Sequence, residues 1–100
     1  MSSPLLGNYK GHPPGQFAEH RGWQLCWNCE SLPHKRVRVN VTAVHQRTPR
    51  PIFNDRILSP WPVLGGQEIL WYFLEECEDD VRRKVDEIED LEMAWAMKGD

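Results

Sequence analysis

The last third of this 100-residue chain contains one long segment without glycine or proline, which runs from Gln67 to Met97. Proline breaks the interior of a helix and glycine weakens it, so a segment of this length that lacks both predicts a helix. Gly65-Gly66 before it and Lys98-Gly99 after it are typical boundary residues. At ~1.5 Å per residue, about thirty residues form a helix of roughly 45 Å. We expect part of this helix to project from its small domain or to pair with another chain.

Apolar residues recur at spacings of three and four along this segment, which is the pattern of one helix face. This stripe suits a contact with a helix or groove of a protein partner, and a coiled coil is one form of that contact. Lys84 at a seam position argues against a long, perfect coiled coil. The predicted partner-binding residues are Leu74, Val81, Val85, Ile88, Leu91 and Trp95.

The other faces of the segment are strongly acidic, and this limits the partners that its apolar stripe suits. Residues 63–100 contain four Lys or Arg and twelve Asp or Glu, a balance of −8. A basic protein partner is therefore favoured, whereas a homodimer through this helix needs an antiparallel register that brings Arg82, Arg83 and Lys84 against the acids. A simpler interpretation is an acidic surface that only contacts solvent.

Residues 35–46 carry the clearest strand pattern in the chain. Val37, Val39, Val41 and Ala43 alternate with polar residues, and β-branched residues with period two favour a half-buried strand. A strand needs partners for its backbone groups, and the segments at 23–29 and 51–58 are the candidates. The sequence therefore predicts a short antiparallel sheet.

The chain is short enough for one domain, within which three regions differ in composition. Residues 1–22 are rich in proline and glycine and predict an extended arm. Residues 23–62 form the predicted zinc-knuckle and strand region, and residues 63–100 form the predicted amphipathic acidic helix. The predicted fold class is α+β: a small zinc-stapled head with a short antiparallel sheet and one long C-terminal acidic helix.

The zinc prediction rests on the Cys26-x-x-Cys29 spacing, which on a tight turn supplies two thiolates to a tetrahedral site. His34 and His20 are close enough in sequence to complete a set of four, and His45 is the alternative ligand. A structural zinc contributes about 10–16 kcal/mol to the stability of a small domain. The alternatives are that both cysteines are small buried apolar residues, or that they form a redox pair. A redox pair is disfavoured because no helix begins at the first cysteine.

The first 62 residues are basic, with eight Lys or Arg against three Asp or Glu, and this supports a second class of function. Cationic side chains bind a nucleic-acid backbone and aromatic rings stack on its bases. The candidate residues are Arg36, Arg38, Arg50 and Trp27. The acidic helix competes for the same positive charges, so DNA or RNA binding ranks below protein binding.

No glycine-rich phosphate loop, metalloprotease motif or activated nucleophile occurs in the sequence, so we do not expect an enzyme. The preferred prediction is a small regulatory or adaptor protein with a structural zinc that captures a protein partner. Its size and its five tryptophans also suit a viral or phage accessory protein. The alternatives are an RNA- or DNA-binding protein and a zinc-free obligate dimer paired through the C-terminal helix. The N-terminus lacks a signal-peptide pattern and the chain lacks a long apolar run, which predicts an intracellular protein of the cytoplasm or nucleus.

Overall fold

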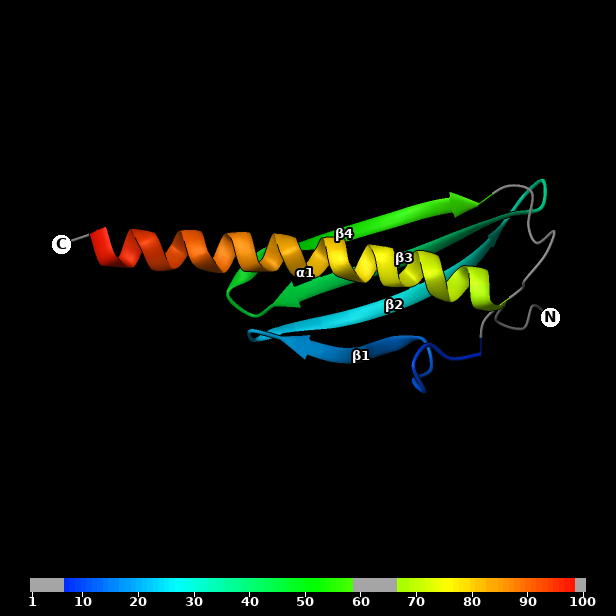
Figure 1. Cartoon of the computed structure of the whole chain (residues 1–100), viewed down its shortest axis with the longest axis horizontal. Helices are drawn as coiled ribbons and strands as arrows, with labels where there is room; N and C mark the ends of the chain where they lie inside the picture. The colour runs from blue at the N-terminus through cyan, green and yellow to red at the C-terminus, as the bar shows by residue number, and fades with distance from the viewer. Residues whose placement is uncertain (1–6, 59–66, 99–100) are drawn as a thin grey trace.

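The computed structural model describes residues 7–58 and 67–98, which form a four-stranded antiparallel sheet and one long helix (Figure 1). The strands are β1 (Gly15–His20), β2 (Trp23–Leu32), β3 (Arg36–His45) and β4 (Thr48–Leu58), and the helix is α1 (Gln67–Lys98). The α+β class and the single C-terminal helix predicted from the sequence are therefore confirmed. The boundary predicted at residues 62 and 63 lies outside the described residues.

The strands follow one another in the sheet in their order along the chain, each antiparallel to the next. β2 and β3 pair without interruption from Gln24 opposite Val44 to Leu32 opposite Arg36. Both predicted partners of the valine-rich strand are thus confirmed as its neighbours β2 and β4. β1 was not predicted, because it lies inside the region interpreted as an extended arm.

The β1–β2 connection is a two-residue turn made by Arg21 and Gly22. Both have positive φ, at 52° and 87°, as tight hairpin turns of this kind require. A side chain at Gly22 would also lie 3.4 Å from Nε2 of His45, so the turn sits closely against the end of β3. Arg21 of this turn contacts Asp86 and Asp90 of the C-terminal helix, so the turn lies beside that helix.

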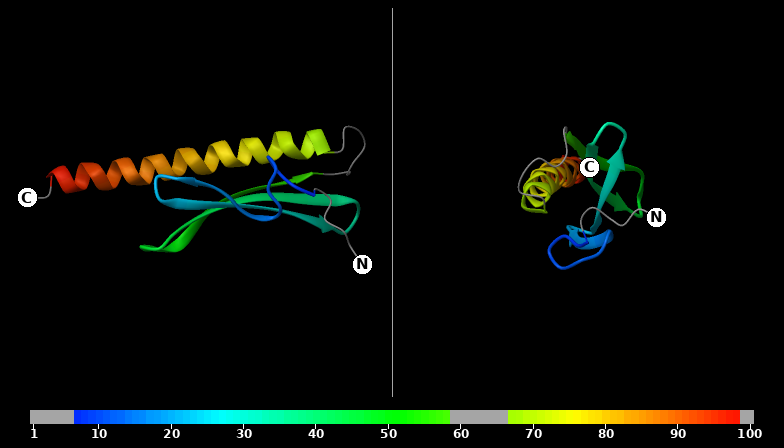
Figure 2. Two further views of the ribbon diagram at one scale, coloured as in Figure 1. Left: turned by 90° about the horizontal axis from the view of Figure 1, so that it is seen from below. Right: turned by 90° about the vertical axis from the view of Figure 1, so that its right-hand side faces the viewer.

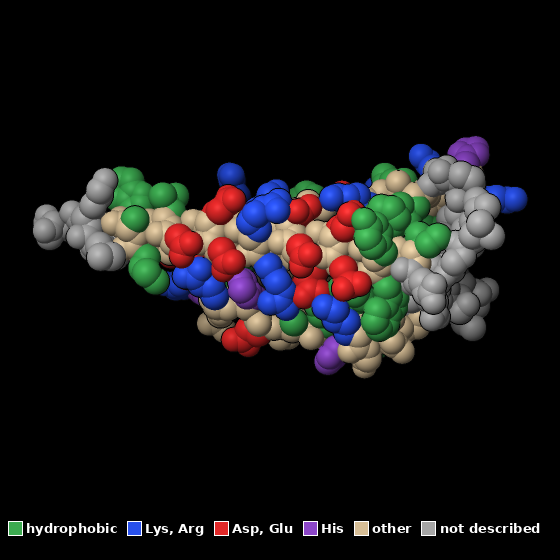
Figure 3. All heavy atoms as spheres, viewed as in Figure 1, with side chains coloured by type: hydrophobic (Ala, Val, Ile, Leu, Met, Phe, Trp, Pro, Cys, Tyr) green, Lys and Arg blue, Asp and Glu red, His purple; other side chains and the backbone are tan. Residues whose placement is uncertain are grey.

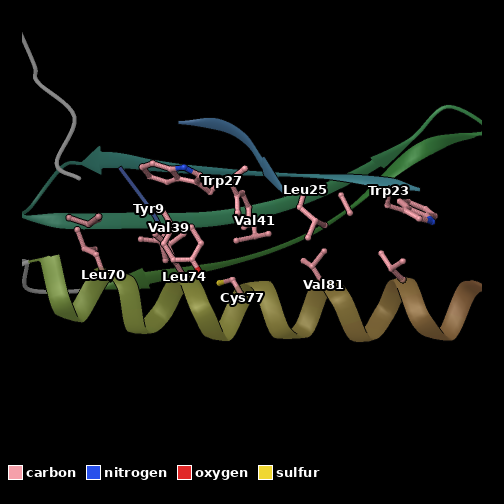
Figure 4. Packing of buried hydrophobic residues seen from close by; sticks show 14 residues of the cluster. Tyr9, Trp23, Leu25, Trp27, Val39, Val41, Leu70, Leu74, Cys77 and Val81 are labelled. Carbon is pink, nitrogen blue, oxygen red and sulfur yellow. The ribbon is translucent and has the colours of Figure 1, made fainter. Parts of the chain in front are cut away.

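The helix lies along one face of the sheet, which we call the helix face (Figure 2). Side chains alternate along each strand, so Val37, Val39, Val41 and Ala43 of β3 point to the helix and are fully buried. Figure 4 shows the core between the two layers. Its other buried apolar members are Tyr9, Phe17, Trp23, Leu25, Trp27, Leu70, Leu74, Cys77, Val81 and Val85.

The sheet face away from the helix, which we call the open face, is mostly polar. Arg38, Asn40 and Thr42 of β3 lie there, beside Phe53, Asp55 and Ile57 of β4. In the part of the chain that the structure describes, no element covers this face.

The helix is longer than the sheet, as predicted. Its 32 residues span about 48 Å at ~1.5 Å per residue. In Figures 1 and 2 its C-terminal turns extend beyond the hairpins of the sheet. Among the described residues, helix α1 does not have an apolar stretch long enough to cross a membrane.

Candidate partner-binding surface

The apolar stripe of α1 divides into a buried part and an exposed part. Leu74, Val81 and Val85 are fully buried against the sheet. These three predicted partner-binding residues belong to the domain's own core, so the prediction that they contact a partner does not fit this fold. An apolar stripe has the same sequence pattern whether a sheet or a partner covers it, so the pattern alone does not show which residues belong to the core.

The remaining three predicted residues lie where the helix leaves the sheet. Ile88 is partly buried and packs against the core, whereas Leu91 is 60% exposed and Trp95 is 70% exposed. Spacings of three and four residues keep these side chains on the face that continues the buried seam. We call Ile88, Leu91 and Trp95 the distal stripe. Figure 3 shows apolar side chains gathered at this end of the helix.

The surroundings of the distal stripe are acidic. Residues 85–95 contain five Asp or Glu and no Lys or Arg. Two arginines from the hairpin turns lie against this acidic surface: Arg21 contacts Asp86 and Asp90 at 3.2 Å each, and Arg47 lies 4.0 Å from Glu92. Five negative and two positive charges leave this end of the molecule at −3. The hydrogen bonds to His20 and Arg21 lower the pKa of Asp86, so it stays ionised at neutral pH.

The four predicted zinc ligands do not come together. Cys26 and Cys29 lie in the middle of β2 and not on a tight turn. Successive side chains of a strand point to opposite faces, so two residues three positions apart are on different faces of the sheet. Cys29 packs against the core on the helix face, whereas Cys26 lies on the open face opposite Thr42. Among the described residues, no group of three or more His, Cys, Asp or Glu side chains is arranged to hold a metal.

The histidines are equally far from forming such a site. His20 pairs with Trp23 at one end of β2, and His34 lies in the turn beyond the other end. The ten-residue strand between them spans about 30 Å. His45, the alternative ligand, stacks at a tilt on Trp23, 5.3 Å between ring centres. In this arrangement the predicted set cannot ligate one ion, so zinc binding stays a prediction without a ligand set in the described residues.

His20 instead connects the β1–β2 hairpin to the helix. Its Nε2 lies 2.7 Å from Oδ1 of Asp86, and its Nδ1 lies 3.2 Å from Nη1 of Arg82. Close by, the indole N–H of Trp23 donates to Glu89 at 2.9 Å. These contacts attach the sheet to the last covered turns of α1, just before the distal stripe.

The predicted nucleic-acid residues are also dispersed. Trp27 is 1% exposed in the core, and its indole N–H donates to the carbonyl of His12, so the ring is inaccessible to a base. Arg38 lies on the open face between Glu30 and Asp55. Arg36 donates to the carbonyl of Pro33, and Arg50 is exposed on β4. No described aromatic ring from the predicted set accompanies these arginines.

A buried polar cluster around Glu78 escaped the sequence interpretation. The Glu78 carboxylate accepts hydrogen bonds from Tyr9 at 2.7 Å, Arg82 at 2.7 Å and Lys10 at 3.1 Å. Burial alone raises the pKa of Glu78, but these three donors outweigh it and the net pKa is lowered. The available signal was an acidic residue between Leu74 and Val81 in the apolar seam, where an unpaired charge is costly.

Comparison with known proteins adds nothing to this geometry. The chain matches no protein-family model, no curated protein and no solved structure.

Proposed function

We propose that this chain is a small non-enzymatic adaptor or regulatory protein that captures a protein partner through the distal stripe. The observation that carries the proposal is the continuation of the apolar seam beyond the sheet, where Leu91 and Trp95 are 60% and 70% exposed. A helix that served only to cover the sheet would have no need of a large apolar side chain at these positions.

Trp95 is the residue of the distal stripe best suited to anchor a partner. Trp is enriched among the residues that dominate protein–protein binding, since it buries a large area with few rotatable bonds. Leu91 precedes it by four residues, which is the spacing of an anchor pair on a helix that binds a groove. The core beneath Ile88 holds this end of the helix in place, so little order is lost when a partner binds.

The charge around the stripe supports a basic partner. Five acidic residues and two arginines favour a partner segment with an apolar face and basic flanks. Such flanks increase the association rate at low salt and discriminate against acidic surfaces. The proposed partner is therefore a basic amphipathic helix of another protein.

Binding is proposed in place of catalysis because His20 and Glu78, which could act as an acid or a base, make hydrogen bonds to other side chains of the fold. His20 is held by Asp86 and Arg82, and Glu78 is held by Tyr9, Lys10 and Arg82. The proposal does not depend on zinc, since the distal stripe is positioned by the sheet and the hairpin contacts.

A peptide selection tests the proposal. Helical peptides are selected from a random library on the intact chain, and their affinities are measured for the natural chain and for Leu91→Asp, Trp95→Asp and Met93→Asp. Met93 is 56% exposed but lies on another side of the helix, so it is the matched control. We expect basic amphipathic peptides that lose at least about tenfold in affinity with the first two variants and little with the third.

Two results would contradict this function. Acidic or charge-neutral peptides would contradict the proposed partner chemistry, and equal binding to all variants would place the contact elsewhere. If Leu91→Asp converts a dimer into a monomer, the occupant of the stripe is a second copy of the chain, as in the helix-dimer alternative. Thermal unfolding of each variant establishes that the sheet and helix remain folded.

A further inference from the structure

β4 is an edge strand whose outer side has no partner among the described residues. It pairs with β3 on one side only, and Figure 1 shows it along the border of the sheet. An edge strand presents free N–H and C=O groups that can pair with another strand. Pro49 and Pro51 lack an N–H, which limits regular pairing to the seven residues Ile52–Leu58.

These seven residues are complementary to themselves when two strands run antiparallel about Asp55. That register places Ile52 opposite Leu58, Phe53 opposite Ile57 and Asn54 opposite Arg56. Each of these pairs joins two apolar or two polar side chains on the same face, as cross-strand pairing favours.

Neighbouring registers lack this match. A shift by two residues in one direction places Phe53 opposite Asp55 and Ile52 opposite Arg56. The shift in the other direction places Arg56 opposite its own copy and Asp55 opposite Ile57. Both put apolar side chains opposite charged ones, so the sequence of β4 favours the register centred on Asp55.

The apolar side chains that this register would pair are exposed in the single chain. Phe53 is 59% exposed and Ile57 is 50% exposed, both on the open face, where the surrounding side chains are polar. Ile52 and Leu58 are partly buried on the helix face and pack against the core. Pairing would cover Phe53 and Ile57 with each other and would extend the core at Ile52 and Leu58.

The central position brings two Asp55 side chains together, and the structure holds a compensating charge beside each. Nε of Arg38 lies 3.7 Å from Oδ2 of Asp55 and is buried without a hydrogen-bond acceptor. Two Arg38 guanidinium groups would flank the two carboxylates and offset their repulsion. On the helix face, Arg56 donates to Oδ1 of Asn54 in the same chain at 2.6 Å. In the dimer, Arg56 of one copy would lie opposite Asn54 of the other and could make the same kind of hydrogen bond between the chains.

We propose that two copies of this chain associate through their β4 strands, which pair antiparallel in the register centred on Asp55. The two sheets then form one continuous sheet with four strands from each copy. This interface is separate from the distal stripe and independent of the proposed adaptor function. The contact is small compared with that of a typical stable dimer, which buries about 1,200–2,000 Å², so the association is expected to depend on protein concentration.

A charge-pair exchange tests both the interface and its register. Sedimentation equilibrium over a wide concentration range measures the association of the natural chain, F53K, I57E and the double variant F53K/I57E. Each single variant places a charge opposite an apolar residue in two symmetric pairs, and we expect association at least about tenfold weaker. In the double variant each introduced lysine faces an introduced glutamate of the other copy, and we expect most of the association to return.

The outcomes are distinct from those for the distal stripe. Support requires a solution mass that approaches twice the 11.7 kDa of one chain, with loss and rescue by the β4 variants and no change in Leu91→Asp. A natural chain that stays at 11.7 kDa at every concentration overturns the proposal. A dimer that ignores the β4 variants overturns it as well, and a double variant weaker than both singles overturns the register.

Discussion

The phenolic hydroxyl of Tyr9 donates a 2.7 Å hydrogen bond to the carboxylate of Glu78, although 69 residues separate them in sequence. Tyr9 is fully buried, and its ring meets those of Phe17, Trp27 and Trp71 at 5.2, 6.0 and 5.4 Å between centroids. One residue thus joins the N-terminal segment, the sheet and the helix. This contact holds residues of the predicted arm against the domain.

Tyr9→Phe removes the hydroxyl and leaves the aromatic packing in place. Glu78 then loses one of its three donors in a buried site, and hydrogen bonds to charged groups are worth about 1.5–3 kcal/mol. We expect the free energy of unfolding, measured by urea denaturation, to fall by about that amount. Tyr72→Phe is the control, since Tyr72 is 57% exposed, and its effect should stay within about 0.5 kcal/mol. Equal effects of the two variants would contradict the role of Glu78.

The lowered pKa of Glu78 makes the stability of the fold depend on pH. A carboxyl group whose pKa is lower in the folded chain than its ordinary value of 4.5 stabilises the fold above that value. This stabilisation is lost as the pH falls below 4.5 and the group takes up a proton. We expect the unfolding temperature of the natural chain to decrease in this window, and less steeply in Glu78→Gln. A steeper decrease in the variant would contradict the assignment.

The elements with regular patterns were predictable, whereas the relations between them were not. The valine alternation of 35–46 became β3, and the segment free of glycine and proline became α1. β1 was not predicted, because Gly15 and the prolines before it are typical of a loop, although this six-residue strand pairs with β2. The sequence pattern of a helix stripe is the same whether a sheet or a partner covers it, so it could not show that the sheet ends near Ile88.

The cysteine spacing shows how a motif depends on the backbone that carries it. Two residues between Cys26 and Cys29 place their side chains together on a turn but on opposite faces of a strand. The alternation of Trp23, Leu25 and Trp27 towards the core was the signal for a strand at this position. The spacing of the cysteines and histidines in the sequence does not by itself show whether they lie on a strand or on a turn.

The division of the helix stripe predicts different costs for similar substitutions. Leu74→Ala removes a fully buried side chain and should lower the free energy of unfolding by about 2–5 kcal/mol. Leu91→Ala removes a side chain that is 60% exposed and should change it by no more than about 0.5 kcal/mol. Chemical denaturation of the two variants measures both values. A large loss in Leu91→Ala would show that this end of the helix is covered within the folded chain.

The three free cysteines should react with alkylating reagents in a fixed order. Burial raises the pKa of all three thiols, to about 11 for Cys29 and Cys77, and the thiolate is the reactive form. Cys26 and Cys29 are both partly buried, but Cys26 is on the open face and Cys29 packs against the core, whereas Cys77 is fully buried. At about pH 8 we expect iodoacetamide to modify Cys26 first, Cys29 more slowly and Cys77 only after unfolding, as mass spectrometry of digested protein would reveal. Rapid modification of Cys77 in the folded chain would contradict its place in the core.

Metal analysis and cysteine substitution test whether Cys26 and Cys29 bind zinc or lie on opposite faces of β2. With Cys26 and Cys29 on opposite faces of β2, we expect a chelator to leave the unfolding temperature unchanged. Cys26→Ser should be nearly neutral, because the side chain is on the open face, whereas Cys29→Ser places a hydroxyl against the core and should cost more. A metal staple predicts a different result, in which the purified protein holds one equivalent of zinc and both substitutions abolish folding alike. Comparing the loss of stability in Cys26→Ser with that in Cys29→Ser therefore distinguishes the two structures. Two ligands of one zinc ion should give equal losses, whereas two residues on opposite faces of a strand should give different ones.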